Sequence, residues 1–183
     1  MSSSSSIGPT IETARLILRP PSGEDFEPFA AFMANPGTAN FIGGVMVRSV
    51  AWRTLSTFAG GWMINGYSMF SWIEKDTGRW IGRGGPWQPA EWPGPEVGWG
   101  VIAEAQGKGY AQEAARAAID WAFDHLGWTD VIHCIDPKNA PSIGVAKALG
   151  SSVMRSGVVA PAPMVATWDI YGQTREQWRA RAR

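Results

Sequence analysis

The stretch Gln106-Gly107-Lys108-Gly109-Tyr110-Ala111 decides how this sequence is interpreted. It separates a run typical of a strand, Glu96 to Ile102, from a run typical of a helix, Tyr110 to about His125. The start of a helix leaves main-chain N–H groups without intrahelical partners and carries the positive end of the helix dipole, which suits a phosphate. The two glycines keep side chains away from the backbone at this point. The pattern predicts a pyrophosphate-binding loop, with an ordinary glycine-rich turn as the alternative.

Two other phosphate-binding motifs do not fit the residues and the elements expected around them. A P-loop requires Gly-Lys followed by Ser or Thr, whereas Lys108 is followed by Gly109. The glycine pattern of dinucleotide-binding folds is matched literally by residues 98–103, Gly-Trp-Gly-Val-Ile-Ala. Those residues form the expected strand itself, and no helix opens at the third glycine position. A dinucleotide-binding redox protein is therefore only a distant alternative.

The regions around this stretch predict an alternation of strands and helices. Strands are expected at residues 15–20, 67–74, 79–84, 96–102, 131–135 and 165–171, and helices from Ser22 to Met33, from Ser49 to Gly60-Gly61, at 110–125 and at 139–149. Residues 86–95, rich in proline and tryptophan, are expected to form a loop. This order predicts a single α/β domain, a mixed sheet with helices on its faces, over residues 11–175. Residues 1–10 are expected to form a disordered tail and residues 176–183 a basic tail.

The composition narrows the function classes. Lys plus Arg and Asp plus Glu number 16 each, so the formal charge is zero and nucleic acid is not expected as a partner. A single cysteine cannot form an internal disulfide, and with only two histidines the chain has few metal ligands, so no metal is expected. We expect Cys134 to be a small buried apolar side chain, and His125 and His133 to be structural. The serine-rich start lacks a secretion signal and no long apolar run is present, so a cytoplasmic protein without membrane contact is expected.

Several motifs together resemble the GNAT superfamily of N-acetyltransferases, and in particular its RimJ/RimL branch. The Gln-x-x-Gly-x-Ala pattern of residues 106–111 is similar to the acetyl-CoA signature of that superfamily. Four further stretches agree in order, at residues 13–20, 77–82, 96–99 and 139–150. The resemblance covers about residues 11–172. It implies a mixed sheet that is splayed open at its centre, with acetyl-CoA as co-substrate and no metal.

The resemblance also implies the positions of the acetyl-CoA contacts. The pantetheine arm would lie between the strand ending at Ile102 and the strand ending at Ile135, paired with main-chain groups of Val101 and Ile102. The loop of Gln106, Gly107, Lys108, Gly109, Tyr110 and Ala111 would hold the pyrophosphate. Asn139 would touch the pantetheine or orient the acetyl group. Lys108, Arg116 and Lys147 are candidates for the 3′-phosphate, each with a solvated surface charge as the alternative.

Acetyl transfer to an amine requires a neutral amine, a polarised thioester carbonyl and a departing thiolate. Glu96, at the start of the strand beside the expected splay, is our first candidate for the base, with Glu104 and Asp136 as reserves. A backbone N–H near Val101 or Ile102 would meet the oxyanion. The resemblance implies a tyrosine near the thiolate in many GNAT enzymes, but residues 137–150 contain none. Ser142, at a position where the RimJ/RimL branch also has serine, is the replacement candidate. Alternatively, Ser142 is a residue of the first turn of the helix whose hydroxyl bonds the backbone.

The acceptor is expected to be a primary amine, either a protein N-terminus or a small molecule. Three loops would shape its site, residues 35–46, 86–95 and 157–165, and their low charge and tryptophans favour an apolar or flat acceptor. A homodimer is possible. The main alternative from another class is a catalytically idle module that binds acyl-CoA and acts as a sensor.

Overall fold

The computed structural model describes residues 7–162 and 164–181. The helices are α1 (Phe26–Ala34), α2 (Pro36–Ala39), α3 (Arg48–Asn65), α4 (Tyr110–His125), α5 (Ala140–Leu149) and α6 (Arg175–Arg181), with short 3₁₀ turns at Gly23–Asp25 and Ala103–Ala105. The strands are β1 (Ile11–Glu12), β2 (Leu16–Arg19), β3 (Phe70–Glu74), β4 (Trp80–Trp87), β5 (Glu96–Val101), β6 (Asp130–Ile135), β7 (Ser152–Val159) and β8 (Thr167–Thr174).

The strands form one mixed sheet in the order β1-β2-β3-β4-β5-β6-β8-β7. All neighbours are antiparallel except β5 and β6, which run parallel and share a single residue pair, Glu96 with Ile132. Beyond that pair the two strands separate, so the sheet is splayed at its centre. The expected α/β fold with a centrally splayed mixed sheet is confirmed.

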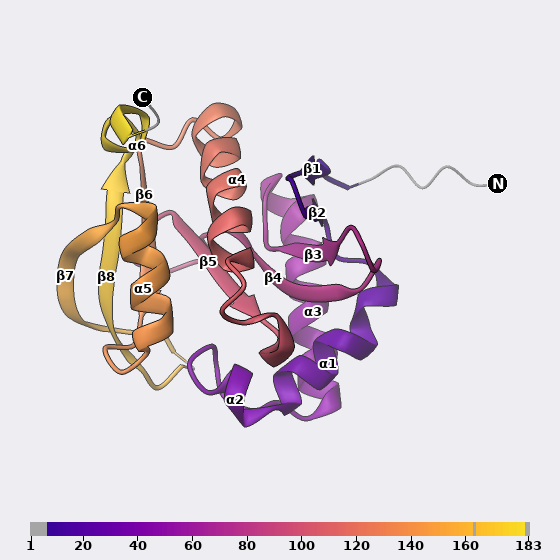
Figure 1. Cartoon of the computed structure of the whole chain (residues 1–183). Helices are drawn as coiled ribbons and strands as arrows, with labels where there is room; N and C mark the ends of the chain where they lie inside the picture. The colour runs from indigo at the N-terminus through magenta and orange to yellow at the C-terminus, as the bar shows by residue number, and fades with distance from the viewer. Residues whose placement is uncertain (1–6, 163, 182–183) are drawn as a thin grey trace.

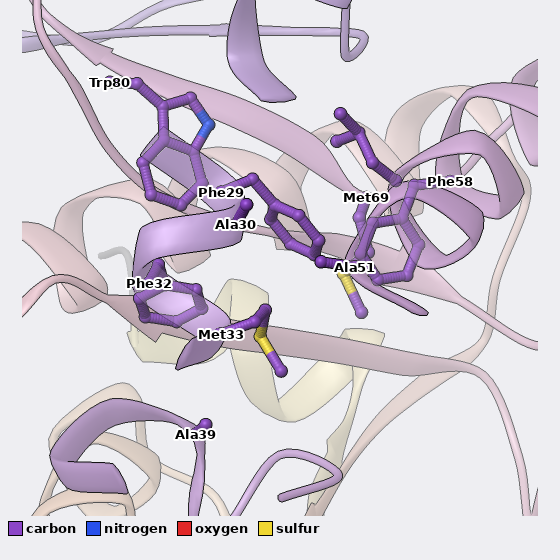
Figure 2. Packing of buried hydrophobic residues seen from close by; sticks show 10 residues of the cluster. Phe29, Ala30, Phe32, Met33, Ala39, Ala51, Phe58, Met69 and Trp80 are labelled. Carbon is purple, nitrogen blue, oxygen red and sulfur yellow. The ribbon is translucent and has the colours of Figure 1, made fainter. Parts of the chain in front are cut away.

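Helices cover both faces of the sheet. Figure 1 shows α4 and α5 together in front of the central strands, and these two helices contact each other. Ala114, Ala115, Ala118 and Ala122 are buried, so the small face of α4 lies close against the sheet. On the other face α1 and α3 pack on β3 and β4 through an aromatic cluster that contains Phe29, Phe58, Met69 and Trp80 (Figure 2).

Several predicted boundaries were wrong. Helix α3 continues through Gly60 and Gly61 and ends at Gly66, which adopts a left-handed φ of 74° that suits glycine. The short helix α2 after α1 was not expected; Asn35 ends α1 in an extended conformation, and its side chain caps α2 by accepting from the N–H of Gly37. Strand β7 was missed because its exposed face carries Ser, Met and Arg rather than an alternating apolar pattern.

The end of the domain also differs from the expectation. Residues 175–181 form helix α6, and Trp178 is buried against the domain with its indole N–H donating to Asp120. The described part of the predicted basic tail is therefore part of the packed fold. Residues 1–6 of the predicted disordered tail, and residues 182–183, lie outside the described residues. Within residues 7–162 and 164–181, no helix has both the length and the apolar character required to cross a bilayer.

Candidate functional site

The splay between β5 and β6 is built by two side chains that replace sheet hydrogen bonds. The Oε1 atom of Glu96 accepts the main-chain N–H of Cys134 at 3.0 Å, and Nδ1 of His133 lies 2.7 Å from the carbonyl oxygen of Val97. A carbonyl only accepts, so Nδ1 of His133 carries the proton. Nε2 then accepts from the hydroxyl of Ser151 at 3.0 Å. The strands can therefore part at this point without leaving buried polar groups unpaired.

His133 is buried, whereas Cys134, which was expected to be buried, is partly exposed, and both residues line the cavity described below. Burial lowers the pKa of His133 to about 4, so the ring is neutral at physiological pH. Burial and the neighbouring Glu96 carboxylate raise the pKa of the Cys134 thiol, which keeps it protonated and unreactive.

Glu96 is the central charged group of the splay. Its side chain is only 7% exposed, and Oε2 accepts the indole N–H of Trp92 at 2.6 Å. Burial raises the pKa of Glu96 to about 6, against the opposing effects of its hydrogen bonds and of Arg83. A carboxylate with this pKa is mostly ionised at neutral pH and is a stronger base than an ordinary glutamate.

A cavity of about 700 Å³ opens above Glu96. Asp136, Asn139 and Ser142, which the sequence placed in the site, line the same cavity. Its other walls come from the segment 40–46, the face of α3, and the aromatic residues Phe58, Trp87, Trp92, Trp99 and Trp168. The structure thus brings together Glu96, Asp136, Asn139 and Ser142 from β5, the end of β6 and the start of α5.

Ser142 takes part in a contact that crosses the splay. Its hydroxyl accepts the indole N–H of Trp99 at 3.3 Å, whereas the helix cap is Asn139, whose Oδ1 accepts the N–H of Ser142 at 3.3 Å. The capping hypothesis for the Ser142 hydroxyl is therefore wrong, and the capping oxygen belongs to Asn139. Trp99 was missed, although it stands where the resembling strand pattern has tyrosine.

The predicted phosphate loop has the backbone shape that its glycines allow. Gly107 and Gly109 have φ values of 72° and 80°, in the left-handed region that other residues avoid. A Cβ at Gly107 would have no neighbour within 4 Å, so the space beside the loop is open to a ligand. The first-turn N–H groups of α4, from Tyr110 onward, have no intrahelical acceptors. Together these features fit a pyrophosphate.

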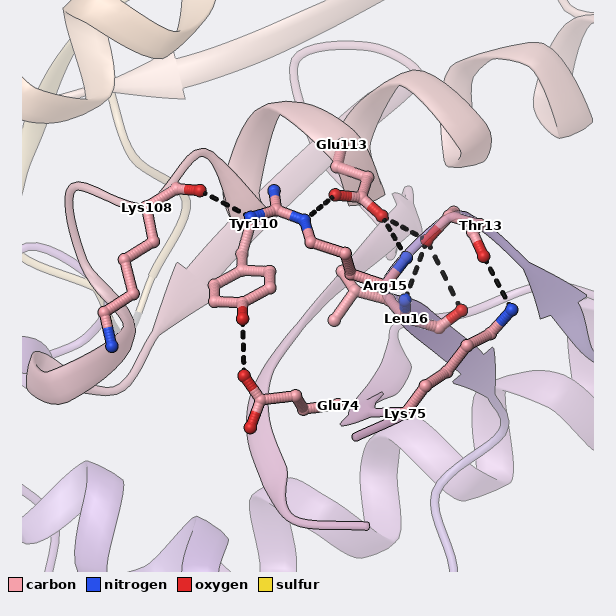
Figure 3. Close-up of polar contacts among 8 residues, drawn as sticks. All are labelled: Thr13, Arg15, Leu16, Glu74, Lys75, Lys108, Tyr110 and Glu113. Atoms are coloured by element: carbon pink, nitrogen blue, oxygen red, sulfur yellow. Dashed lines mark hydrogen bonds and ion pairs between the residues drawn. The ribbon is translucent and has the colours of Figure 1, made fainter. Parts of the chain in front are cut away.

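The loop is fixed by contacts with the N-terminal strands (Figure 3). Nη1 of Arg15 donates to the carbonyl of Lys108 at 2.9 Å, and Nε of Arg15 donates to Glu113 of α4 at 2.7 Å. The guanidinium also lies 4.2 Å from the ring centroid of Tyr110, whose hydroxyl donates to Glu74 at the end of β3. Tyr110 therefore anchors the loop through its side chain, a role that the sequence did not indicate.

Main-chain pairing distinguishes Val101 from Ile102. The N–H of Ile102 donates to Ile81 at 3.0 Å and its carbonyl accepts from Ala105 at 3.0 Å. The prediction that the Ile102 N–H meets a ligand or an oxyanion is therefore wrong, because this N–H is used within the protein. The carbonyl of Val101 accepts from Nε2 of Gln106 at 3.3 Å. Val101 lies opposite Gly82 in the register. The main-chain groups of successive residues in a strand point alternately to its two sides. Ile102 bonds to β4, so the N–H and C=O groups of Val101 and Trp99 point to the other side, toward the splay.

The remaining predicted residues lie outside the cavity. Glu104 is exposed in the 3₁₀ turn before the phosphate loop, so it is not placed to act beside Glu96. Lys147 is exposed in the last turn of α5, and Arg116 of α4 donates to the carbonyl of Ala148 at 3.1 Å. Lys108 is exposed in the loop itself. Among the described residues, no group of His, Cys, Asp or Glu side chains is arranged to hold a metal ion.

Residues 86–95 were expected to form a loop throughout, but Pro86 and Trp87 belong to β4, because they pair with Val97 and Glu96 of β5, and the loop begins at residue 88. Trp92 holds Glu96 and contacts Trp168 with ring centroids 5.1 Å apart, and Trp87 contacts Phe58 at 5.2 Å. Nη2 of Arg155 in β7 donates to the carbonyl of Pro93 at 2.9 Å and fixes the loop to the far side of the splay. The loop therefore forms a wall of the cavity, as its position in the sequence suggested.

Comparison with known proteins agrees with this geometry. The family described as "Acetyltransferase (GNAT) domain" matches residues 15–152. The uncharacterized protein YkkB of Bacillus subtilis is 38% identical over 89 residues, which are 46% of this chain and 52% of that protein, so the chain spans about half of its length.

Solved structures extend the likeness over nearly the whole chain. An acetyltransferase from Agrobacterium tumefaciens superposes with a TM-score of 0.80 and 30% identity, covering 91% of this chain and 95% of that one. A ribosomal-protein-S5-alanine acetyltransferase from Vibrio fischeri has the same fold, with a TM-score of 0.72, 18% identity and coverage of 93% and 98%. On the match over residues 15–152, this chain belongs to the GNAT acetyltransferase family.

Proposed function

We propose that the protein transfers the acetyl group of acetyl-CoA to a primary amine by direct attack in a ternary complex. The observation that carries the proposal is the position of Glu96, a buried carboxylate with a pKa of about 6 at the floor of the cavity. Membership of the GNAT family supports acetyl-CoA as the co-substrate. The fold shared with a ribosomal-protein acetyltransferase supports the RimJ/RimL branch, in which protein N-termini and small amines are both acceptors.

The two faces of the sheet would receive the two substrates. The loop 106–111 and the first turn of α4 would bind the pyrophosphate through main-chain N–H groups, and Lys108, Arg116 or Lys147 would reach the 3′-phosphate. The main-chain groups of Val101 and Trp99 would pair with the pantetheine arm along the splay. Asn139 and Ser142, at the start of α5, would lie beside the thioester. The acceptor would enter from the side of α1 and α3, where Glu96 faces the cavity.

Acetyl-CoA supplies a thioester whose carbonyl carbon is attacked by the amine while the C–S bond breaks. Glu96 would take the proton that the attacking amine releases, directly or through a water molecule. The main-chain N–H of Val101 would stabilise the negative charge on the carbonyl oxygen. The hydroxyl of Ser142, which accepts from Trp99, keeps its own proton available for a hydrogen bond to the leaving thiolate.

Ligand binding and turnover test the proposal separately. Saturating acetyl-CoA should raise the melting temperature, because a ligand that binds only the folded state stabilises it. Dephospho-CoA should give a smaller shift if one of the three basic residues meets the 3′-phosphate. Release of free thiol from acetyl-CoA in a screen of amines should then identify acceptors. Binding without thiol release for any amine would instead favour the idle acyl-CoA-binding sensor, and no thermal shift would contradict both.

A further inference from the structure

The cavity contains a positive charge that the proposed reaction does not use. Arg83 on β4 lines the cavity together with Glu96. Its register partner on β5 is Gly100, and Trp87 pairs with Glu96, so Arg83, Trp87, Glu96 and Gly100 share one face of the sheet. That face is the acceptor side, because the Arg83 guanidinium lies 5.6 Å from the ring centroid of Phe58 in α3.

Arg83 has almost no partner within the protein. Among the described residues its guanidinium makes one hydrogen bond, from Nη1 to the Sδ atom of Met69 at 3.8 Å, and thioether sulfur is a weak acceptor. Its Nε atom is buried and has no hydrogen-bond partner among those residues. No carboxylate of the described chain lies within ion-pair distance of Arg83, and Glu96 acts on it only as a more distant charge.

Such an arrangement is costly unless a ligand completes it. Arg83 is partly buried, and its buried Nε loses hydration without gaining a hydrogen bond among the described residues. Burial lowers the pKa of Arg83 to about 10, so the group stays charged at neutral pH. A planar guanidinium binds a carboxylate through parallel hydrogen bonds, more strongly than it binds neutral oxygens.

Resting on the proposed acetyl transfer, we infer that the acceptor is an amine that also carries a carboxylate, and that Arg83 binds this carboxylate while Glu96 receives the amine. The ammonium and carboxylate of such a molecule match the negative Glu96 and the positive Arg83 on the same face of β4 and β5. Both charged side chains line the same cavity of about 700 Å³, which gives a ligand access to the two of them. The aromatic walls formed by Phe58, Trp87, Trp92 and Trp168 suit an apolar or aromatic body.

The reaction stays balanced with these roles. The ammonium transfers one proton to Glu96, and the neutral amine nitrogen then forms the new C–N bond while the C–S bond breaks. The second proton of the nitrogen passes to the departing sulfur, so the products are the amide, the free thiol of CoA and protonated Glu96. The carboxylate bound by Arg83 takes no part in bond changes and only positions the amine. The carboxylate has two possible sources, a free amino acid or an acidic side chain beside a peptide N-terminus.

Matched acceptors test the inference. We would compare phenylalanine with 2-phenylethylamine, and a peptide whose second residue is Asp with the same peptide carrying Asn. The wild-type protein should show a higher kcat/KM for the carboxylate member of at least one pair, by about 10- to 100-fold, as expected for a charged hydrogen-bonded contact. A preference in the first pair identifies a free amino acid as the source, and a preference in the second identifies a peptide.

Variants assign the preference to Arg83. Arg83→Met should lower kcat/KM for the carboxylate member about 10- to 100-fold more than for the neutral member, and Arg83→Lys should restore part of the preference. Arg79→Met changes an exposed arginine of the same hairpin and should have no effect. The inference would be overturned if the wild type had equal kcat/KM for the two members of both pairs. It would also be overturned if Arg83→Met lowered kcat/KM equally for the carboxylate and the neutral member.

A binding measurement separates this inference from the proposed reaction. In the presence of CoA, N-acetylphenylalanine should bind more tightly than N-acetyl-2-phenylethylamine by calorimetry, and Arg83→Met should remove the difference. This measurement needs no turnover, so it decides the role of Arg83 even if no amine releases thiol. If neither pair of ligands is distinguished by the wild-type protein in binding or turnover, Arg83 is not a carboxylate site.

Discussion

The indole N–H of Trp99 on β5 donates to the hydroxyl of Ser142 at the start of α5, across the gap where the sheet is splayed. This bond joins two halves of the sheet whose strands share only the pair Glu96 and Ile132. Under the proposed function the pantetheine arm would lie beside this bond, and the tryptophan ring and the serine hydroxyl would both border the thioester. Ser142 is therefore placed to orient groups at the reaction centre.

Ser142→Ala should have a modest effect. The variant loses the hydrogen bond from Trp99, whose net contribution is about 0.5–1.5 kcal/mol. The helix cap is retained, because the capping oxygen belongs to Asn139. We therefore expect single-turnover rates to fall by about tenfold or less, with acetyl-CoA affinity unchanged. Asn139→Ala is the comparison, since it removes the cap and should lower stability by about 1 kcal/mol. A thousandfold loss of rate with Ser142→Ala would make Ser142 the required acid.

Glu96→Gln should lower turnover and change its pH dependence. With a pKa of about 6, Glu96 is protonated below that pH, so the wild-type rate should rise as the pH increases through 6. The variant should lack this rise, and its deficit should shrink at high pH, where the free amine is abundant. Acetyl-CoA affinity, measured by thermal shift, should change little.

The glutamine of that variant cannot accept from both Trp92 and Cys134, so a control is needed. Trp92→Phe removes the indole N–H but keeps the carboxylate, and it should retain the rise of rate with pH. If Trp92→Phe loses activity as completely as Glu96→Gln, the wall of the cavity rather than the base explains the loss.

Gly109→Val should abolish acetyl-CoA binding in a folded protein. The left-handed φ of 80° disfavours a β-branched residue, and the new side chain would occupy the space beside the loop. Gly127→Val is the matched control, because Gly127 has a φ of 68° and no neighbour within 4 Å but lies beyond the other end of α4. Both variants should lose about 1–2 kcal/mol of stability, and only Gly109→Val should lose the thermal shift. Normal binding by Gly109→Val would place the phosphate site elsewhere.

His133 should make the protein sensitive to acid. Its pKa is about 4 in the folded protein against 6.5 for the free side chain, so the unfolded state binds more protons between these values. The stability that His133 contributes is complete above pH 6.5 and decreases as the pH falls to 4. At pH 5 the loss should be on the order of 2 kcal/mol, from about 1.4 kcal/mol per pKa unit.

Urea denaturation of the wild type and His133→Gln at pH 7 and pH 5 measures this effect. The variant should be less stable at pH 7, and the difference between the proteins should shrink at pH 5. Glu96 acts in the opposite direction, because its raised pKa decreases the free energy of unfolding as the pH increases from 4.5 to 6. Glu96 is present in both proteins, so its contribution cancels in the difference between them. A difference that does not vary with pH would show that His133 does not titrate on unfolding.

Arg83→Met should not destabilise the protein. The change replaces a partly buried charge that has no carboxylate partner among the described residues with an apolar side chain of similar length, and such a change is commonly neutral or stabilising. We expect the free energy of unfolding to stay within about 1 kcal/mol of the wild type or to increase. A loss of more than about 3 kcal/mol would indicate that Arg83 has a structural partner role.

The sequence predicted the elements that have strong local signals. The glycines of residues 106–111, the alanine spacing of α4 and the helix-ending Gly150 placed the phosphate loop and two helices almost to the residue. Glu96 was found because it begins a strand next to the motif. Local signals could not reveal β7, whose residues are polar and which forms only by pairing with β8.

Long-range contacts account for what the sequence could not indicate. The use of the Ile102 N–H depends on the register with β4, and the link from Trp99 to Ser142 joins residues 43 positions apart. The isolation of Arg83 is likewise a property of the assembled cavity, because nothing in the sequence around it distinguishes it from a surface arginine. Each of these features depends on which strands become neighbours rather than on any local pattern.

The contact between Arg15 and the phosphate loop also affects the thermodynamics of binding. Arg15, in the bend before β2 and more than 90 residues earlier in the chain, holds the carbonyl of Lys108 and the Glu113 side chain of α4 in place. The loop is then ordered before a ligand arrives, so little conformational entropy is lost on association. Weakening this contact would decrease affinity through disorder of the free protein, with every atom that touches the ligand still present.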